Sequence, residues 1–217
     1  MSDHFHTELA SFKDEVIWYG RFALDVLKNS ISAFETGDEI IAANLIRQKT
    51  YVSSQYEMLY AKGILLIALH QPMAADLRLI SCSMDVVTSS ERIGRYGKDI
   101  AELVSSEENS LPAKLHEMGE LAGMILENVY NVFESGDLTL LQNCAEIEDR
   151  VDSLYKEIYA ELIAAMDERK LSAAFGSACL MVNRYLERCS DHACRMGEKM
   201  YYSQTGKHIP LSEMKKN

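Results

Sequence analysis

The sequence has little of what loops, disulfide frameworks and membrane spans are built from. Its 217 residues include only 3 prolines and 11 glycines, so little of the chain can be turn or linker. The five cysteines are odd in number and form no CxxC pair, which disfavours both a disulfide framework and a zinc knuckle. No apolar run approaches the about 20 residues that a helix needs to cross a bilayer. We therefore expect a globular protein with reduced thiols and no membrane-spanning segment.

Positive charge is also scarce. Lys and Arg number 22 against 33 Asp and Glu, which gives a formal net charge of -11 at pH 7. Such a surface repels nucleic-acid phosphates and anionic lipid headgroups, and it favours cations as small ligands. The N-terminus shows no basic stretch followed by an apolar core, as a secretory signal would. Together with the unpaired cysteines, this predicts a cytoplasmic location, no nucleic-acid partner and no direct insertion into a membrane.

The sequence motifs of common catalytic folds are missing as well. There is no Walker loop, GxGxxG, GxSxG or HExxH, and the Glu-x-x-His spacing of di-iron bundles does not occur. No pair of nucleophile and base stands out. The sequence therefore gives no sign of these catalytic sites, and we expect no organic cofactor.

What the chain has in abundance is helical periodicity. Apolar residues recur every three to four positions nearly throughout, which indicates an all-α fold of amphipathic helices. The tetrapeptide Glu35-Thr36-Gly37-Asp38 ends the first helix, because its glycine suits a helix C-terminus and its aspartate can cap the next helix. That second helix is expected to run unbroken from about Asp38 to about Leu69. Pro72 then fits the first turn of a third helix.

The pattern then starts again, which indicates an internal duplication. Glu134-Ser135-Gly136-Asp137 matches the earlier tetrapeptide at an offset of 99 residues, and at least ten other positions are identical at that offset. Further along, the offset becomes 96. A period near 100 residues is too long for TPR or HEAT repeats, and it fits two tandem three-helix bundles. We place the first repeat at residues 1–109 and the second at 110–217.

Four carboxylates of the second repeat have the spacing of a shared metal site. Glu148 and Asp152 are four residues apart on one predicted helix, and Glu187 and Asp191 are four apart on the next. Each pair borders the apolar stripe of its helix, so this acidic quartet converges if the two helices lie side by side. Oxygen ligands of this kind suit Fe, Mn, Mg or Ca. The alternative is an ordinary solvated face on which arginines of the same helix pair with these acids.

The first repeat lacks this acidic quartet. At the matching positions it has Lys49 and Ser53 on one helix and Glu91 and Arg95 on the other. The one remaining carboxylate can pair with Arg95, four residues further along the helix. Whatever the second repeat binds, the first is not expected to bind in the same way.

An ordered set of motifs resembles the PhoU family of phosphate-transport regulators. The set comprises Gln71-Pro72-Met73-Ala74-Ala75-Asp76-Leu77-Arg78, Glu91-Arg92-Ile93-Gly94, Tyr185-Leu186-Glu187-Arg188-Cys189-Ser190-Asp191-His192 and Gly206-Lys207. The resemblance covers essentially the whole chain, including the duplication.

This resemblance implies a cytosolic, dimeric regulator, not an enzyme, built from two three-helix bundles. Members of the family damp the phosphate ABC transporter, here through its ATPase subunit, and in many bacteria a phosphate-sensing histidine kinase. By resemblance, the acidic quartet is the expected metal site, for Fe or alternatively Mn, Mg, Ca or Zn. The resemblance also gives a structural or partner-binding role to the motif residues Gln71, Pro72, Asp76, Arg78, Glu91, Arg92 and Arg188.

Two other functions remain open at this point. One is a metal-dependent enzyme or metal store that uses the acidic quartet, and bound metal with turnover lost on Glu187→Ala and Asp191→Ala substitution would favour it. The other is a purely structural helical adaptor, which a lack of both bound metal and transporter or kinase association would favour.

Overall fold

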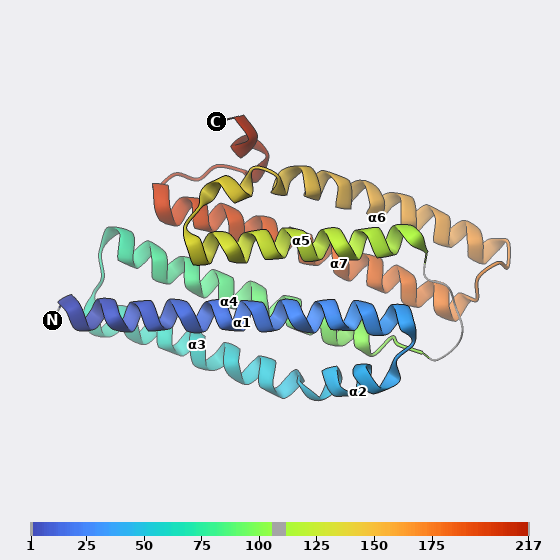
Figure 1. The fold of residues 1–217 in the computed structure, drawn as a ribbon, viewed down its shortest axis with the longest axis horizontal. Helices are drawn as coiled ribbons and strands as arrows, with labels where there is room; N and C mark the ends of the chain where they lie inside the picture. Colours follow the sequence, from blue (N-terminus) through green and yellow to red (C-terminus); the bar gives the residue numbers. More distant parts are fainter. Residues whose placement is uncertain (1, 106–111, 217) are drawn as a thin grey trace.

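The computed structural model describes residues 2–105 and 112–216, and these are almost entirely helical with no strand among them. Figure 1 shows the helices of the first repeat in one half of an elongated molecule and those of the second repeat in the other half. The α-helices are α1 (Ser2–Thr36), α2 (Glu39–Arg47), α3 (Lys49–His70), α4 (Ala74–Ala101), α5 (Ala113–Ser135), α6 (Cys144–Asp167) and α7 (Ala173–Thr205), with short 3-10 helices at η1 (Leu138–Leu141) and η2 (Leu211–Lys216). The all-α fold with its two three-helix repeats is confirmed, whereas the predicted boundary between residues 109 and 110 lies outside the described residues.

The prediction of one unbroken helix from Asp38 to Leu69 is wrong. The helix is interrupted at Gln48, whose backbone N–H donates to the Leu45 carbonyl 3.1 Å away, three residues back rather than four. The tighter turn separates α2 from α3 and lets α2 bury its own apolar face. Ala42 and Leu45 of α2 form a small cluster with Val26 of α1 and Ala101 of α4. Tertiary packing therefore sets this break, because no proline or glycine marks it.

The two copies of the tetrapeptide end one helix and cap the next, as the sequence predicts. Gly37 and Gly136 adopt left-handed backbone conformations with φ of 67° and 77°, which favour glycine. The Asp38 carboxylate accepts hydrogen bonds of 2.9 Å from the backbone N–H groups of Ile40 and Ile41. The same glycine conformation recurs in both copies of the tetrapeptide, because the residues that end one helix and cap the next lie within four positions of each other.

The two repeats share one hydrophobic core. Helices α1 and α4 of the first repeat pack against α5 and α7 of the second, and the largest buried apolar cluster includes residues from both. Ion pairs join α1 and α5 along this junction, among them Arg21 with Glu134 at 3.0 Å and Lys28 with Glu127 at 2.9 Å. Helices α3 and α6 lie at the two outer edges of the molecule (Figure 1).

All five cysteines are buried free thiols, as the sequence predicts. Burial raises the pKa of each of them, so the thiolate form is strongly disfavoured. Within residues 2–105 and 112–216, no helix combines the length and the apolarity needed to cross a membrane.

Candidate functional site

The acidic quartet of the second repeat lies on two helices that pack against each other. Glu148 and Asp152 are on α6, and Glu187 and Asp191 are on α7. Burial raises the pKa of Glu148, and the charges of Asp152 and Asp191 raise it further, against a hydrogen bond from the Cys194 thiol. The four carboxylates therefore share one electrostatic environment, because charges on both helices disfavour ionisation of Glu148.

Arginines of the same helix already neutralise part of this cluster. Arg184 Nη1 donates to Glu187 Oε2 at 2.9 Å, and Arg188 lies 3.8 Å from both Glu187 and Asp191. The guanidinium charges oppose the rise in the Glu187 pKa that burial and Asp191 cause. Among the described residues, no three His, Cys, Asp or Glu side chains come together as a group that could hold a metal ion. The carboxylates thus share a face, but their geometry in this structure does not fit a preformed metal site.

The matching face of the first repeat is an internal ion-pair cluster. Glu91 Oε1 lies 3.4 Å from Arg95 Nη1, as the spacing predicts, and Glu91 Oε2 lies 3.7 Å from Arg92 Nε. The side chains of Glu91 and Glu187 are exposed by 12% and 16%, so the two glutamates occupy equally sheltered places in their repeats. The difference between the repeats lies in the residues around this glutamate, because Arg95 stands where the second repeat has Asp191.

Aromatic residues that sequence reasoning missed join α4 to α7, close in sequence to the two Glu-Arg motifs. Tyr96 of α4 stacks on Tyr185 of α7 with ring centroids 5.5 Å apart, and it contacts the His192 ring at 6.1 Å. Burial, followed by the charge of Arg195, lowers the pKa of His192 to about 4, so this histidine is neutral at pH 7. His192 is half-buried against the Tyr96 ring. Only the pairing of α4 with α7 brings these residues together, so no pattern within either helix could have predicted the contact.

The motif from Gln71 to Arg78 forms the turn between α3 and α4. Gln71 has a left-handed backbone with φ of 48°, which ends α3. The expected place of Pro72 in the first turn is wrong, because α4 begins at Ala74 with Met73 as its N-cap and the proline precedes the helix. Extended backbone at Met73 is what separates the proline from the first helical residue.

Asp76 and Arg78 are two residues apart on α4 and do not face each other, so each has its partner on another helix. Asp76 Oδ2 lies 3.5 Å from His6 Nε2 of α1. Arg78 Nε donates a 3.0 Å hydrogen bond to the Ser203 carbonyl in the last turn of α7. A cation is favoured at a helix C-terminus, so Arg78 joins the turn of the first repeat to the end of the second.

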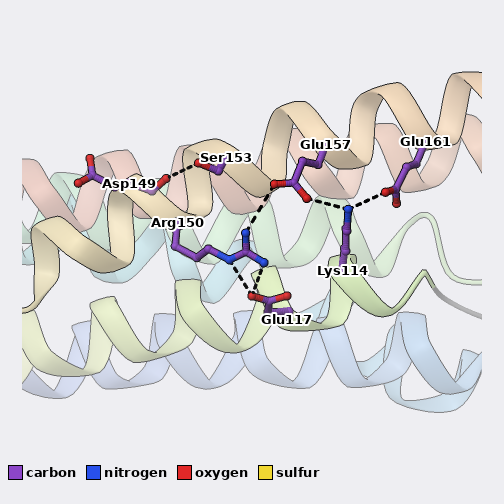
Figure 2. Close-up of polar contacts among 7 residues, drawn as sticks. All are labelled: Lys114, Glu117, Asp149, Arg150, Ser153, Glu157 and Glu161. Carbon is purple, nitrogen blue, oxygen red and sulfur yellow. Dashed lines mark hydrogen bonds and ion pairs between the residues drawn. The ribbon is translucent and has the colours of Figure 1, made fainter.

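A second charged cluster, not anticipated from sequence, covers the outside of α5 and α6 (Figure 2). Lys114 bridges Glu157 and Glu161 at 2.7 and 2.6 Å, while Arg150 bonds to Glu117 at 2.8 Å and reaches Glu157 at 3.6 Å. Exposed pairs of this kind each contribute at most about 1 kcal/mol to stability. Their main effect is to keep the α6 edge charged and hydrated.

Comparison with known sequences identifies the family that this arrangement belongs to. A sequence model of the PhoU domain matches residues 16–104 and again residues 115–200, once in each repeat. A relative from Clostridium acetobutylicum, named a phosphate-specific transport system accessory protein PhoU homolog, is 28% identical over 96% of this chain and 98% of its own length. A relative of the same name from Deinococcus radiodurans is 33% identical over 71% of this chain and 75% of its own length.

Two solved structures have the same fold. The crystal structure of PhoU from Pseudomonas aeruginosa superposes with a TM-score of 0.88 over 94% of this chain and 100% of that chain. The crystal structure of the phosphate transport system regulatory protein PhoU from Streptococcus pneumoniae gives a TM-score of 0.87 over 94% and 99%. Both are 23% identical to this chain, so they establish the fold alone.

Proposed function

The chain belongs to the PhoU family, and on this premise we propose that it regulates phosphate uptake by binding partner proteins. The proposed partner is the ATPase subunit of a phosphate ABC transporter, with a phosphate-sensing histidine kinase as a second partner. Binding damps both transport and phosphate-starvation signalling. The protein acts in the cytoplasm as a homodimer and catalyses no reaction.

The family match in both repeats carries this proposal. Relatives named accessory proteins of phosphate transport align over nearly the full length of this chain and of their own. Regulation by binding needs stable surfaces rather than a reaction centre. The shared core of α1, α4, α5 and α7 supports this, because it holds the outer faces of both repeats in one rigid arrangement.

Deletion of the gene tests the proposed function. Under excess phosphate, the deletion strain is expected to take up radiolabelled phosphate several-fold faster than its parent and to accumulate more of it, because the transporter has lost its inhibitor. A plasmid copy of the gene should restore the parental rate. Deleting the ATPase subunit as well should abolish the excess uptake. Unchanged uptake and accumulation in the single deletion would exclude the proposed role.

We propose, secondly, that the acidic quartet binds a metal ion, with Fe first and Mn, Mg, Ca or Zn as alternatives. The supporting observation is the mutual destabilisation of the carboxylates of α6 and α7, which a cation would relieve. Loading through Glu187 Oε2 requires Arg184 to leave, because Arg184 Nη1 already donates to this oxygen at 2.9 Å, while Arg188 Nε lies 3.8 Å from it. An enzymatic or storage role for this repeat would depend on such a metal.

Metal titration of the apoprotein gives the corresponding test. Adding Fe²⁺ or Mn²⁺ is expected to raise the Tm of the wild-type protein, because an ion that binds only the folded state stabilises it. The variant with both Glu187→Ala and Asp191→Ala should retain no metal by elemental analysis and should show no rise in Tm. The Glu91→Ala variant of the first repeat is the matched control and should respond as wild type does. Metal retained by the double variant would contradict the site.

A further inference from the structure

Three aromatic side chains meet on the outside of the first repeat, where α1 lies beside the start of α3 (Figure 1). Trp18 of α1 stacks on Phe22, one turn further along the helix, with ring centroids 5.7 Å apart and planes 10° apart. The Tyr51 ring of α3 meets both edge-on, with centroids at 6.1 and 5.3 Å. Phe22 packs against the core, whereas Trp18 is 50% and Tyr51 40% exposed. We call these three residues the aromatic cluster.

The second repeat has an ion pair at the same place. At the offset of 99 residues, Glu117 corresponds to Trp18 and Arg150 to Tyr51. Figure 2 shows the Arg150 guanidinium against the Glu117 carboxylate, and Arg150 Nη2 lies 2.8 Å from Glu117 Oε1. Because an ion pair joins the two helices of the second repeat here, the fold does not require an exposed tryptophan at this position.

Two acidic side chains flank the aromatic cluster along α1. Asp14 is four residues before Trp18 and Asp25 is seven after it, so both lie on the same side of the helix as the tryptophan. Both are exposed, and neither has an ion pair or hydrogen bond with another residue of the described ranges 2–105 and 112–216. The matching positions of the second repeat have Ala113 and Met124. The acids, like the aromatic pair, are therefore particular to the first repeat.

The neighbouring basic side chains do not neutralise these acids. Three of them on α1 all bond to α5, namely Lys13, Arg21 and Lys28. Lys49 is two residues from Tyr51 and faces a different side of α3. Arg47 is in the last turn of α2, where the helix dipole favours a cation. Two unpaired carboxylates beside exposed aromatic rings attract cations, and the net charge of -11 strengthens this attraction.

We propose that the aromatic cluster, with Asp14 and Asp25, is the docking surface for a basic segment of a partner protein. An arginine of that segment stacks on Trp18, because a guanidinium is attracted to the face of an indole ring. Two further basic side chains pair with the flanking acids, which the helical rise places about 16 Å apart. An extended segment of about five or six residues covers this distance. The inference rests on the proposed function, in which the protein acts by binding partners, and it gives one partner a surface.

The fluorescence of Trp18 tests the proposal directly, because it is the only tryptophan of the chain. The purified full-length protein is titrated with the capped peptide Arg-Ala-Arg-Ala-Ala-Arg, whose extended form spaces its arginines as Asp14, Trp18 and Asp25 are spaced. This peptide is expected to change the tryptophan emission saturably. The same peptide with glutamate or leucine in place of arginine should not. No saturable change at millimolar arginine peptide, or an equal change with the leucine peptide, would overturn the proposal.

Replacing both flanking acids tests their part while Trp18 stays in place as the reporter. Asp14→Asn with Asp25→Asn should raise the Kd for the arginine peptide by about 5-fold or more at low salt. Added NaCl should weaken peptide binding to wild type more than to this variant, because salt screens the exposed charges. Glu146→Gln with Asp167→Asn removes two exposed acids from α6 and is the control, with an unchanged Kd. Equal Kd values for wild type and the first variant would refute the role of the acids.

A double substitution that copies the second repeat into the first tests the surface in cells. Trp18→Glu with Tyr51→Arg should form the ion pair seen between Glu117 and Arg150, which keeps the fold and removes the exposed aromatic rings. In the deletion strain, this variant should leave phosphate uptake several-fold above the parental rate. Glu117→Ala with Arg150→Ala should restore the parental rate, and circular dichroism of both proteins should equal that of wild type.

The two proposals fail in different ways. Restoration of the parental uptake rate by the Trp18→Glu, Tyr51→Arg variant would reject the docking surface, while the deletion phenotype would still support the proposed function. The peptide titration does not depend on phosphate uptake, so saturable binding would support the docking surface even if deletion left uptake unchanged.

Discussion

Replacement of Tyr130 by alanine is expected to lower the free energy of unfolding by about 3–5 kcal/mol, the usual cost of removing a buried aromatic side chain. Tyr130 of α5 is fully buried where the two repeats meet. Its ring lies directly against Gly20 of α1, and its hydroxyl is 3.0 Å from that of Ser90 on α4. One side chain therefore contacts two helices of the other repeat, and its removal leaves a cavity at their junction.

Urea denaturation followed by circular dichroism measures this effect. Tyr130→Phe keeps the ring and loses only the hydrogen bond with Ser90, so a smaller cost of about 1 kcal/mol is expected. Tyr159→Ala removes a half-exposed tyrosine of α6 and should be close to neutral. Equal losses for the alanine variants at positions 130 and 159 would show that the junction of the repeats is not tightly packed.

Gly97→Leu is expected to destabilise the protein by about 3 kcal/mol through overpacking. Gly97 of α4 faces the backbone of α1, because a Cβ atom at this position would lie 3.0 Å from the Leu27 backbone nitrogen and 3.0 Å from Val26 Cγ1. A backbone atom cannot move aside as a flexible side chain can. Even Gly97→Ala should be net destabilising, although alanine favours a helix over glycine by about 1 kcal/mol.

Gly123→Ala on α5 is the matched control with the opposite sign. There a Cβ atom would meet Lys28 Cε at 3.3 Å, the flexible end of an ion-paired side chain. Helix propensity should dominate, so stability is expected to rise by up to about 1 kcal/mol. Urea denaturation of the variants gives the free energies, and stabilisation by both alanine substitutions would mean that α1 and α4 are less closely packed than in this structure.

The two repeats show how a duplicated fold can take on two different surfaces. Their capping turns and apolar stripes are nearly the same, since these specify the helices. Their outer edges differ, because α3 presents Met58 and Leu65 where α6 has Glu157 and Ala164. On the second repeat, the acidic quartet is the proposed place for a cation only once Arg184 has left Glu187.

The sequence by itself determined the features that depend on short stretches of chain. Apolar periodicity predicted the helices, and the glycine-aspartate pairs predicted the turns at Asp38 and Asp137, because the side chains that end or cap a helix are within four residues of it. The duplication was visible for the same reason, as each copy repeats these local signals. The pairing of Glu91 with Arg95 follows from helix geometry alone.

Only the tertiary structure decided what depends on which helices are neighbours. The break at Gln48, the contact of Tyr130 with Gly20, and the place of His192 against Tyr96 follow from packing between segments far apart in sequence. The sequence determined only part of the arrangement of the acidic quartet. Its spacing put two carboxylates on each helix, but the structure decided that Arg184 holds Glu187. Apolar periodicity likewise cannot tell a buried stripe from the exposed one on α3, because both obey the same helical spacing and only the presence of a covering helix distinguishes them.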